Sequence, residues 1–576
     1  MINSRKIFEL IILILSVILL NILINYINID IDFTKDNKHN ISQETKNIVR
    51  NLDDNIFCKI YLEGEFPAEF KNLRNATYNF LRNLQDISPD FIQFEFINPN
   101  IKNESDRMKF YKELAKQGLI PTDLHINNEG VKVNQIIFPG AIIYYKDKSI
   151  PVNFLNNYIN KSAKENINQS IEDLEYIFTS ALLNITTDNF DKIAFLEGNG
   201  QLDRKRIYDV INSVMNDNFN LSYYFNVELF NLKELPIDTN TNEKDISKQI
   251  ERMLNYKAII IAKPQIRFND LDKFLIDQYV MNGGKILWLL DGVNSNMDSL
   301  RIRNGSFIAL KHDLNIEDQL FKYGVRINAD IIEDLRSASI PVITGYSNNI
   351  PQQELIKWPY YPILSSYSSH SIVKNIDGVK CDFASSIDTI KNNIKKTILL
   401  TSSSKSRLML SPAEISLDIL HNPPPRISYN NGKKIIAVLL EGQFESVFKN
   451  RILPKEHSKI KFKDISDENQ MIVISDGDII SNKVSENGNI YPLGYDKYID
   501  YTYPGNKYFF INSVRYLCNT NSLNNLKSKE LMLRMLDSEK VSSYRIIIQA
   551  INIIIPFLFL FFIFIIQRLI LKKKYV

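Results

Sequence analysis

The sequence predicts an α/β protein in which two transmembrane helices flank an extracytoplasmic region. Uncharged apolar segments near both ends of the chain, residues 10–24 and 546–566, predict the two helices. Between them, residues 189–300 alternate continuously apolar runs with amphipathic helical patterns, which is typical of a parallel sheet covered on both faces. A small α+β domain is expected ahead of this sheet.

The composition is that of an ordinary globular protein, and it argues against several classes of function. The chain has 576 residues, of which 44% are hydrophobic and 23% are charged, so it can form several domains. The formal net charge of +3 lacks the basic excess of a nucleic-acid-binding protein. The three cysteines, Cys58, Cys381 and Cys518, lie far apart, which argues against a disulfide framework or a cysteine-based metal cluster.

Both terminal segments are long enough to cross a bilayer. Residues 7–29 include the first apolar segment and can span about 30 Å of hydrocarbon. A cleaved signal peptide is the alternative, but no small-x-small cleavage site follows. Residues 546–566 have no charged side chain and lie between Arg545 and Arg568. A buried core helix is rarely so apolar on all faces.

Basic residues lie outside each apolar segment, with Arg5 and Lys6 before the first and Lys572, Lys573 and Lys574 after the second. The positive-inside rule therefore predicts two spans in the inner (cytoplasmic) membrane, both termini cytoplasmic and a large periplasmic domain. The expected divisions are an N-terminal anchor (1–31), an α+β domain (32–166), a connecting helix (167–188), a sheet domain with irregular insertions (189–540), a C-terminal anchor (545–571) and a basic cytoplasmic tail (572–576).

The smaller domain is predicted from a strand–helix–strand order. Ser42 is a plausible cap for an amphipathic helix over residues 42–52. The remaining predicted elements are a strand at 56–62, a helix at 66–87, a strand at 91–97, a strand pair at 136–145 and 149–153, and a helix at 167–184.

The larger domain has the clearest pattern. A strand at 193–196 is followed by a glycine-rich turn, and apolar residues at helical spacing then predict one helix face. That face consists of Ile207, Val210, Ile211, Val214 and Met215. Further strands are predicted at 223–230, 258–262 and 285–290, with helices between them. This alternation predicts a flavodoxin-like, doubly wound domain.

Residues 300–540 are less regular, and their prolines suggest an extended insertion. Apolar runs at 397–401, 435–440 and 471–475 are candidates for extra strands of the same sheet. The last run ends at Asp476-Gly477-Asp478, which resembles the end of the earlier strand at Asp291.

No motif for a known catalytic chemistry is found in the chain. Gly284-Lys285 and Gly432-Lys433 lack both the upstream glycine and the following Ser or Thr of a Walker A motif, so the chain is not expected to hydrolyse ATP by that route. No Gly-x-Ser-x-Gly turn follows the predicted strands, and no two histidines have a metal-binding spacing. No catalytic residue, metal or cofactor is therefore predicted.

The candidate binding site lies at the carboxyl ends of the predicted strands. The turn Glu197, Gly198, Asn199, Gly200 and Gln201 follows one strand, and Asp291 ends a neighbour at the same edge. In open α/β sheets ligands bind at that edge, and a helix start there can bind an anion. The alternative is a simple turn, because tight connections favour Gly and Asn. Asp476 and Asp478 also have two interpretations: they could bind a cation, or they could form a polar turn at the end of the strand.

Several segments together resemble the GldG family, the gliding-motility auxiliary proteins of bacterial ABC transporter systems. The strongest segment is residues 275–288, LIDQYVMNGGKILW. The others are residues 137–142 (IFPGAI), 194–200 (AFLEGNG), 261–264 (IAKP), 474–478 (ISDGD) and 492–495 (PLGY). The resemblance lies in their order and spacing, and it covers nearly the whole chain.

The resemblance implies a membrane-anchored, non-ATPase component of an ABC transporter, auxiliary or substrate-binding and associated with gliding motility. The implied partners are a permease subunit, a separate ATPase subunit, membrane lipid and an unidentified small-molecule or polysaccharide ligand. The sheet domain would be glutamine-amidotransferase-like, as in intraflagellar-transport proteins.

The expected role is binding and assembly, and the chain is not expected to be an enzyme. One alternative is a hydrolase of envelope polysaccharide, which requires paired carboxylates; Glu197 and Asp291 would be that pair. Another alternative is a purely structural scaffold.

Overall fold

The structure is a computed structural model. It describes residues 41–100, 103–128, 131–155, 162–212, 214, 220–237, 244–302, 305–347, 350–374, 376–453 and 462–518, and beyond these only Pro556, Phe561, Phe564 and Ile565. The chain divides into two compact units, Met1–Lys529 and Glu530–Val576. All the strands and helices named below belong to the first unit.

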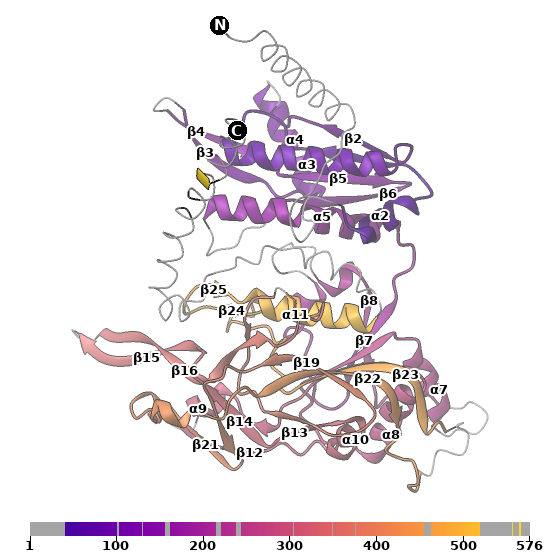
Figure 1. The fold of residues 1–576 in the computed structure, drawn as a ribbon, viewed down its shortest axis with the longest axis vertical. Helices are drawn as coiled ribbons and strands as arrows, with labels where there is room; N and C mark the ends of the chain where they lie inside the picture. Colours follow the sequence, from indigo (N-terminus) through magenta and orange to yellow (C-terminus); the bar gives the residue numbers. More distant parts are fainter. Residues whose placement is uncertain are drawn as a thin grey trace, which may run out of the picture. The chain divides into compact units, whose positions relative to one another are not determined.

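A four-stranded sheet occupies the N-terminal part of this unit, in the order β2-β1-β5-β6 (Figure 1). Its strands are β1 (Ile56–Ile60), β2 (Ile92–Phe96), β5 (Gly140–Tyr145) and β6 (Lys148–Asn153). Strand β1 is parallel to β2 and antiparallel to β5. Residues 56, 58 and 60 of β1 alternate with half-buried neighbours, as expected for a strand whose two faces differ in burial.

Helices pack on this sheet through apolar side chains. They are α2 (Gln43–Arg50), α3 (Ala68–Ile87), α4 (Glu104–Lys116) and α5 (Ala163–Thr186). Leu73 and Leu81 of α3 share one buried cluster with Leu174 and Phe178 of α5. Helix α2 begins after the predicted cap, since the hydroxyl of Ser42 accepts a hydrogen bond from the Thr45 amide. A hairpin of β3 (Thr122–Asn128) and β4 (Val131–Ile137) completes this part.

A ten-stranded sheet forms the centre of the unit. Its strand order is β15-β16-β19-β22-β23-β10-β9-β7-β8, and β17 pairs with β16 beside this path. The strands are β7 (Lys192–Glu197), β8 (Asn226–Asn231), β9 (Ala258–Ala262), β10 (Lys285–Leu289), β15 (Ser337–Ser347), β16 (Ile350–Ser366), β17 (Val379–Lys380), β19 (Lys395–Thr401), β22 (Ile435–Glu445) and β23 (Ile465–Ile474). The three late apolar runs predicted as extra strands are β19, β22 and the end of β23, and all three lie in this sheet.

The direction of the strands changes within this sheet. Strands β8, β7, β9, β10 and β23 run parallel to one another and form the parallel block of the sheet. From β23 onward, the pairs with β22, β19 and β16 are antiparallel. The prediction of a flavodoxin-like parallel-sheet domain is therefore wrong, and the chain has a mixed α/β fold. A strand that is buried on both faces is continuously apolar whether it is parallel or antiparallel to its neighbours. The apolar pattern therefore did not distinguish the two arrangements.

Helices cover both faces of the central sheet. On one face, α11 (Pro504–Leu517) packs Phe509, Phe510 and Val514 into a cluster with Phe195 of β7. On the other face, α7 (Ile246–Leu254), α8 (Asp270–Met281) and α10 (Glu317–Tyr323) pack around Trp288. Figure 1 shows α11 on one side of the sheet and α8 and α10 on the other. The core is therefore two apolar layers separated by the sheet.

The start and end of helix α8 agree with the capping residues in the sequence, whereas the helix after β7 ends earlier than the sequence predicts. Asn269 and Asp272 form a capping box at the start of α8, as a short polar residue before an apolar helix predicts. Gly283 follows this helix with a φ of 93°, a conformation that favours glycine. Helix α6 (Tyr208–Ile211) is shorter than predicted, because Asn212 is already extended. The predicted residue Met215 lies outside the described residues.

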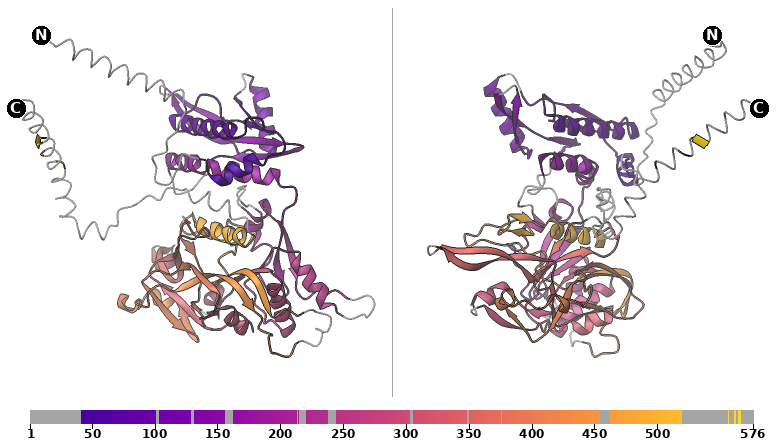
Figure 2. Two further views of the ribbon diagram at one scale, coloured as in Figure 1. Left: turned by 45° about the vertical axis from the view of Figure 1, so that its right-hand side comes forward. Right: turned by 60° about the vertical axis from the view of Figure 1, so that its left-hand side comes forward.

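Short elements fill the connections between β10 and α11. The strands are β11 (Val293–Asn294), β12 (Ser306–Lys311), β13 (Val325–Ile327), β14 (Asp330–Asp334), β18 (Ile387–Thr389), β20 (Ser406–Leu410), β21 (Ala413–Ser416), β24 (Tyr495–Asp496) and β25 (Tyr501–Thr502). The helices are α9 (Met297–Ile302), η2 (Leu417–Leu420) and η3 (Arg426–Ser428), and η1 (Leu221–Tyr223) precedes β8. Figure 2 shows the β15–β16 hairpin extending beyond the rest of the sheet.

The prediction of two transmembrane helices is corrected. Across the described parts of the chain, no helix combines the length and the apolar composition that a bilayer crossing requires. The longest of the described helices, α3 and α5, are amphipathic, and charged residues such as Arg82 and Glu172 interrupt them. The apolar segments behind the prediction lie outside the described residues except at residues 556, 561, 564 and 565. The predicted inner-membrane location, with cytoplasmic termini and a periplasmic domain, is withdrawn together with the two transmembrane helices. The predicted domain limits stay predictions.

Candidate functional site

Charged side chains from three strands of the parallel block meet at one edge of the central sheet. Lys263 follows β9, Asp291 follows β10, and Asp476 and Asp478 follow β23. These strands are parallel neighbours, with Leu289 paired to both Ala262 and Ile474. Their carboxyl ends therefore coincide, and that edge is where open α/β sheets bind ligands. We call Lys263, Asp291, Asp476 and Asp478 the edge cluster.

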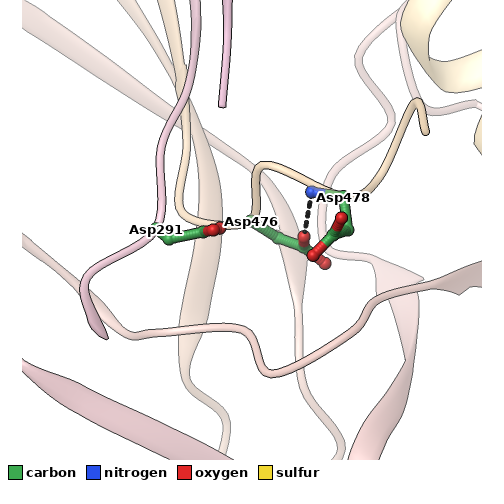
Figure 3. Close-up of side chains that lie close together, drawn as sticks. All are labelled: Asp291, Asp476 and Asp478. Atoms are coloured by element: carbon green, nitrogen blue, oxygen red, sulfur yellow. Dashed lines mark hydrogen bonds between the residues drawn. The ribbon is translucent and has the colours of Figure 1, made fainter. Parts of the chain in front are cut away.

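The three aspartates of the edge cluster lie close together (Figure 3). One carboxylate oxygen from each falls within 4.8 Å of the others, and Asp476 is fully buried. Backbone amides of the turn after β23 orient them. The Asp478 amide donates to Asp476 Oδ1 at 2.7 Å, and the Gly477 amide donates to Asp291 Oδ1 at 2.6 Å.

The side chain of Lys263 supplies the positive charge of the cluster. Its Nζ lies 3.4 Å from Asp291 Oδ2 and donates a hydrogen bond to Asp478 Oδ2. Lys263 has a φ of 52° and precedes Pro264, so a tight turn directs it back over the strand ends. Burial opposes the charged ammonium, but the carboxylates of Asp291 and Asp478 outweigh it and raise the pKa of Lys263. The ammonium is therefore held charged among the three acids.

Burial raises the pKa of two of the aspartates, Asp291 and Asp476. It raises the pKa of Asp291, although Lys263 opposes the change. The pKa of Asp476 is raised further, by burial first and then by the charges of Asp478, Asp291 and Asp382. One ammonium cannot neutralise three carboxylates, so a proton shared within the cluster lowers its charge.

A second ion-pair group adjoins the cluster. The Asp382 amide donates to Asp476 Oδ2 at 2.9 Å. The Asp382 carboxylate lies 2.8 Å from Lys380 Nζ and 2.9 Å from Lys483 Nζ. Burial would raise the pKa of Asp382, but Lys380 and Lys483 outweigh it and lower that pKa. Burial and the negative charge of Asp476 raise the pKa of the neighbouring Cys381 thiol. This thiol is therefore not activated.

Three neighbouring carboxylates are suitable ligands for a hard cation such as Mg²⁺ or Ca²⁺. Asp291, Asp476 and Asp478 are the described residues that could hold one. The Lys263 ammonium already bonds to two of these acids. A metal would have to displace it, because a buried ammonium and a divalent ion repel at this range. The arrangement fits an internal counter-ion better than a metal site.

The structure places the predicted turn at the same edge but outside this cluster. Gly198 and Gly200 have φ values of 113° and 70°, so the turn requires glycine at both positions. Asn199 is fully buried, and its amide nitrogen lies 3.4 Å from the Arg267 carbonyl oxygen. The Gln201 Oε1 accepts a hydrogen bond from the Asn199 backbone amide at 2.8 Å. These bonds close the turn on itself and on the loop after β9.

Of the predicted ligand-site residues, 197–201 and Asp291, the structure brings Asp291 into the cluster, where it lies beside Asp476 and Asp478, the two residues considered for a cation site. Strand β9 lies between β7, which ends at Glu197, and β10, which precedes Asp291. Two strand spacings, about 10 Å, therefore separate the two strand ends. Among the described residues, no hydrogen bond or ion pair joins the turn 197–201 to Asp291.

Sequence reasoning missed Lys263 and the group around Asp382. Lys263 could have been found, because it directly follows the apolar strand β9 at the edge already identified by Asp291. Lys380, Asp382 and Lys483 could not, because they lie outside long regular elements and their contacts depend on the fold.

Comparison with known proteins identifies the family. Residues 191–513, more than half of the chain, match the family described as "ABC-type uncharacterized transport system". This protein belongs to that auxiliary family of ABC-type transport systems, and it is a transporter-associated component other than the ATPase. Residues 35–144 match a domain of unknown function, DUF7088.

Individual relatives add little to the family assignment. The chain is 23% identical over 443 residues to an uncharacterized protein of Borreliella burgdorferi, covering 75% of this chain and 76% of that protein. It also aligns with a solved structure described as the mmIFT52 N-terminal domain at 13% identity and a TM-score of 0.30, covering 57% of this chain and 96% of the other.

Proposed function

We propose that this chain serves its transport system by binding and assembly, beside a separate ATPase subunit and a permease subunit. The family match over residues 191–513 is the observation that supports this proposal most directly. The edge cluster supports it as well, because the Lys263 ammonium is engaged by Asp291 and Asp478. A side chain held in ion pairs orients the strand ends, whereas a catalytic group must be accessible to its substrate.

Within this function, the strand-end edge is the proposed contact site for ligand. It includes the turn 197–201 and Asp291. Its support is geometric, because carboxyl ends of parallel strands converge there and the turn backbone requires two glycines. The ligand class remains a small molecule or a polysaccharide. The link to gliding motility remains a prediction, supported by the segment resemblance around residues 275–288.

Affinity capture of the tagged full-length chain after chemical cross-linking in its own cells tests the assembly role. The expected result is recovery of one ATPase and one permease subunit in amounts comparable to the chain. A strain expressing the tag alone is the control. Recovery of neither subunit, with the chain intact, would contradict the proposal.

The hydrolase alternative is less well supported. It needs Glu197 and Asp291 as a carboxylate pair, but Asp291 already accepts from the Gly477 amide and pairs with Lys263. The double variant Glu197→Gln, Asp291→Asn separates the two ideas. If the purified wild-type chain releases no fragments from envelope polysaccharide, the hydrolase is ruled out, while fragment release that the double variant abolishes would favour it.

A further inference from the structure

A cavity of about 520 Å³ lies between helix α10 and the loop after strand β22. Strand β22 ends at Glu445, which pairs with Ile465 at the start of β23. The cavity is therefore at the amino-terminal edge of the parallel strands, opposite the edge cluster. Its volume is in the range of small-molecule sites, roughly 300–1,000 Å³.

Basic side chains dominate the lining. They are Lys322, Arg326, Lys449 and Arg451, and the acidic lining residues are Glu317 and Asp318. Glu317 is neutralised by Lys311, at 2.9 Å. The lining therefore presents more positive than negative charge to a ligand.

At two points of the cavity, two cations share one carboxylate. Lys322 and Lys449 both pair with Glu445, whose pKa these two lysines lower. Asp464 lies 4.0 Å from Lys449, at the limit of an ion pair.

The second shared carboxylate is Asp318. Arg451 and the buried Lys273 each lie 2.7 Å from it. Burial opposes ionisation of Asp318, but hydrogen bonds from these two cations outweigh it and lower its pKa. The Asp318 group therefore leaves one positive charge that an incoming anion can neutralise, whereas Glu445 and Asp464 together balance Lys322 and Lys449.

The arginines retain donors for such an anion. Arg451 donates a hydrogen bond from Nη1 to Asp318. Arg326 donates from Nε to Asn328 and from Nη2 to Asp388. Within the described ranges, no acceptor bonds Arg451 Nε, Arg451 Nη2 or Arg326 Nη1. A guanidinium with paired free N–H groups suits phosphate, which it binds in a bidentate manner.

The walls are held in place by one buried carboxylate. Asp277 Oδ2 accepts from the Ser446 hydroxyl at 2.6 Å, and Oδ1 accepts from the Val447 amide at 3.1 Å. The hydroxyl of Tyr323, from α10 on the opposite wall, donates to Oδ1 at 2.9 Å. Asp277 therefore ties both walls together, so the cavity is formed before any ligand arrives.

The lining also has an apolar surface. The residue Phe321 is 51% exposed, which is unusual for a phenylalanine, and Val447 lies beside the same cavity. A ligand that combines an anionic group with an apolar or planar part can use both surfaces.

We propose that this cavity binds a small organic phosphate. The phosphate contacts Arg326, Arg451 and the two lysines, and the organic part packs on Phe321. The volume favours a small molecule over an extended acidic peptide. This site is separate from the proposed transport contacts at the strand-end edge, so each can fail without the other.

Calorimetric titration of the full-length protein tests the proposal with inorganic pyrophosphate, ADP and glucose 6-phosphate. We expect at least one organic phosphate to bind more tightly than pyrophosphate, and the comparison of ADP with glucose 6-phosphate distinguishes a nucleotide from a sugar phosphate. Arg451→Gln and Arg326→Gln should each weaken binding about 10-fold. Phe321→Ala should weaken binding of the organic phosphate and leave binding of pyrophosphate unchanged.

Arg82→Gln is the matched control, because it removes an exposed arginine of helix α3 without touching the cavity. Thermal melts establish that each variant is folded. The proposal is overturned if none of the probes binds at about millimolar concentration, or if the cavity variants and Arg82→Gln behave alike. Binding of a glutamate-rich peptide without binding of any phosphate would also overturn it, by assigning the cavity to a protein partner.

Discussion

Lys263 and Asp291 follow neighbouring parallel strands, and Lys263 Nζ lies 3.4 Å from Asp291 Oδ2. Both side chains are largely buried, at 14% and 11% exposure. Removing one member of a buried ion pair leaves the other charge uncompensated, which costs more than the pair contributes. The stability of the central sheet should therefore depend strongly on Lys263.

Lys263→Met is expected to lower the free energy of unfolding by about 3 kcal/mol. Urea unfolding at neutral pH measures it. Lys257→Met is the matched control, since Lys257 lies 3.9 Å from Asp191 with both side chains exposed, and its effect should stay below about 1 kcal/mol. Equal effects of the two variants would contradict the role given to Lys263.

Asp382 should make the protein sensitive to acid. Lys380 and Lys483 lower its pKa below the ordinary value of 3.8 despite burial. The stability that ionised Asp382 gives to the folded protein is therefore fully present at pH values above 3.8. It is lost as the pH falls through the pKa of Asp382 in the folded state. Asp382→Asn should destabilise at neutral pH by about 3 kcal/mol, and its difference from wild type should shrink below about pH 4.

Urea midpoints measured at several pH values between neutral and acidic test this dependence. The control is Asp467→Asn, because Asp467 forms an exposed pair with Lys463 on the surface. A wild-type advantage over Asp382→Asn that grows on acidification would have the wrong sign for this explanation.

Gly477 allows Lys263 to approach the turn after β23. A β-carbon at position 477 would lie 2.6 Å from Lys263 Cγ and 3.0 Å from Asp291 Oδ1. Gly477→Ala should therefore displace Lys263 and cost about 2 kcal/mol. In the Lys263→Met background the cost should be smaller, because those ion pairs are already lost.

A double-mutant cycle from chemical unfolding measures this coupling. Gly345→Ala is the control, since its added β-carbon meets only Gln352 Oε1 at 4.0 Å. Strict additivity of Gly477→Ala and Lys263→Met would show that the turn and the lysine act separately.

Asp277 should be the most costly single polar side chain to remove near the cavity. Truncation to Ala leaves the Ser446 hydroxyl, the Val447 amide and the Tyr323 hydroxyl without their acceptor. Asp277→Ala should cost about 3 kcal/mol, whereas Tyr323→Phe, which removes one of these bonds, should cost about 1 kcal/mol. Thermal and urea unfolding compare the two, and similar losses would argue against Asp277 as the shared acceptor.

The individual elements of the central sheet are largely predictable from the sequence, but their directions are not. The runs at β9 and β10 are continuously apolar, and Asn269 with Gly283 marks the limits of α8. Residues 435–440 of strand β22 are equally apolar, yet this strand runs antiparallel to β23. Side-chain burial determines the apolar pattern, while strand direction depends on connections that the pattern does not contain.

The candidate site was predictable in part for the same reason. Asp291, Asp476 and Asp478 could be recognised as strand-end residues, but their mutual contact depends on β10 and β23 being neighbours. The charge of Lys263 was overlooked because lysines at loop positions are common. The predicted turn at 197–201 lies at the right edge, but its polar groups bond within the turn and to the loop after β9.

The pairing of Leu287 in β10 with Ile472 in β23 has a consequence for biosynthesis. The ribosome must deliver nearly all of the intervening chain before the last parallel strand can dock. Until then, the apolar edge of β10 is open to solvent and to other nascent chains. Translation of this protein therefore includes a long vulnerable interval, in which a chaperone that shields β-edges should improve the yield of native protein.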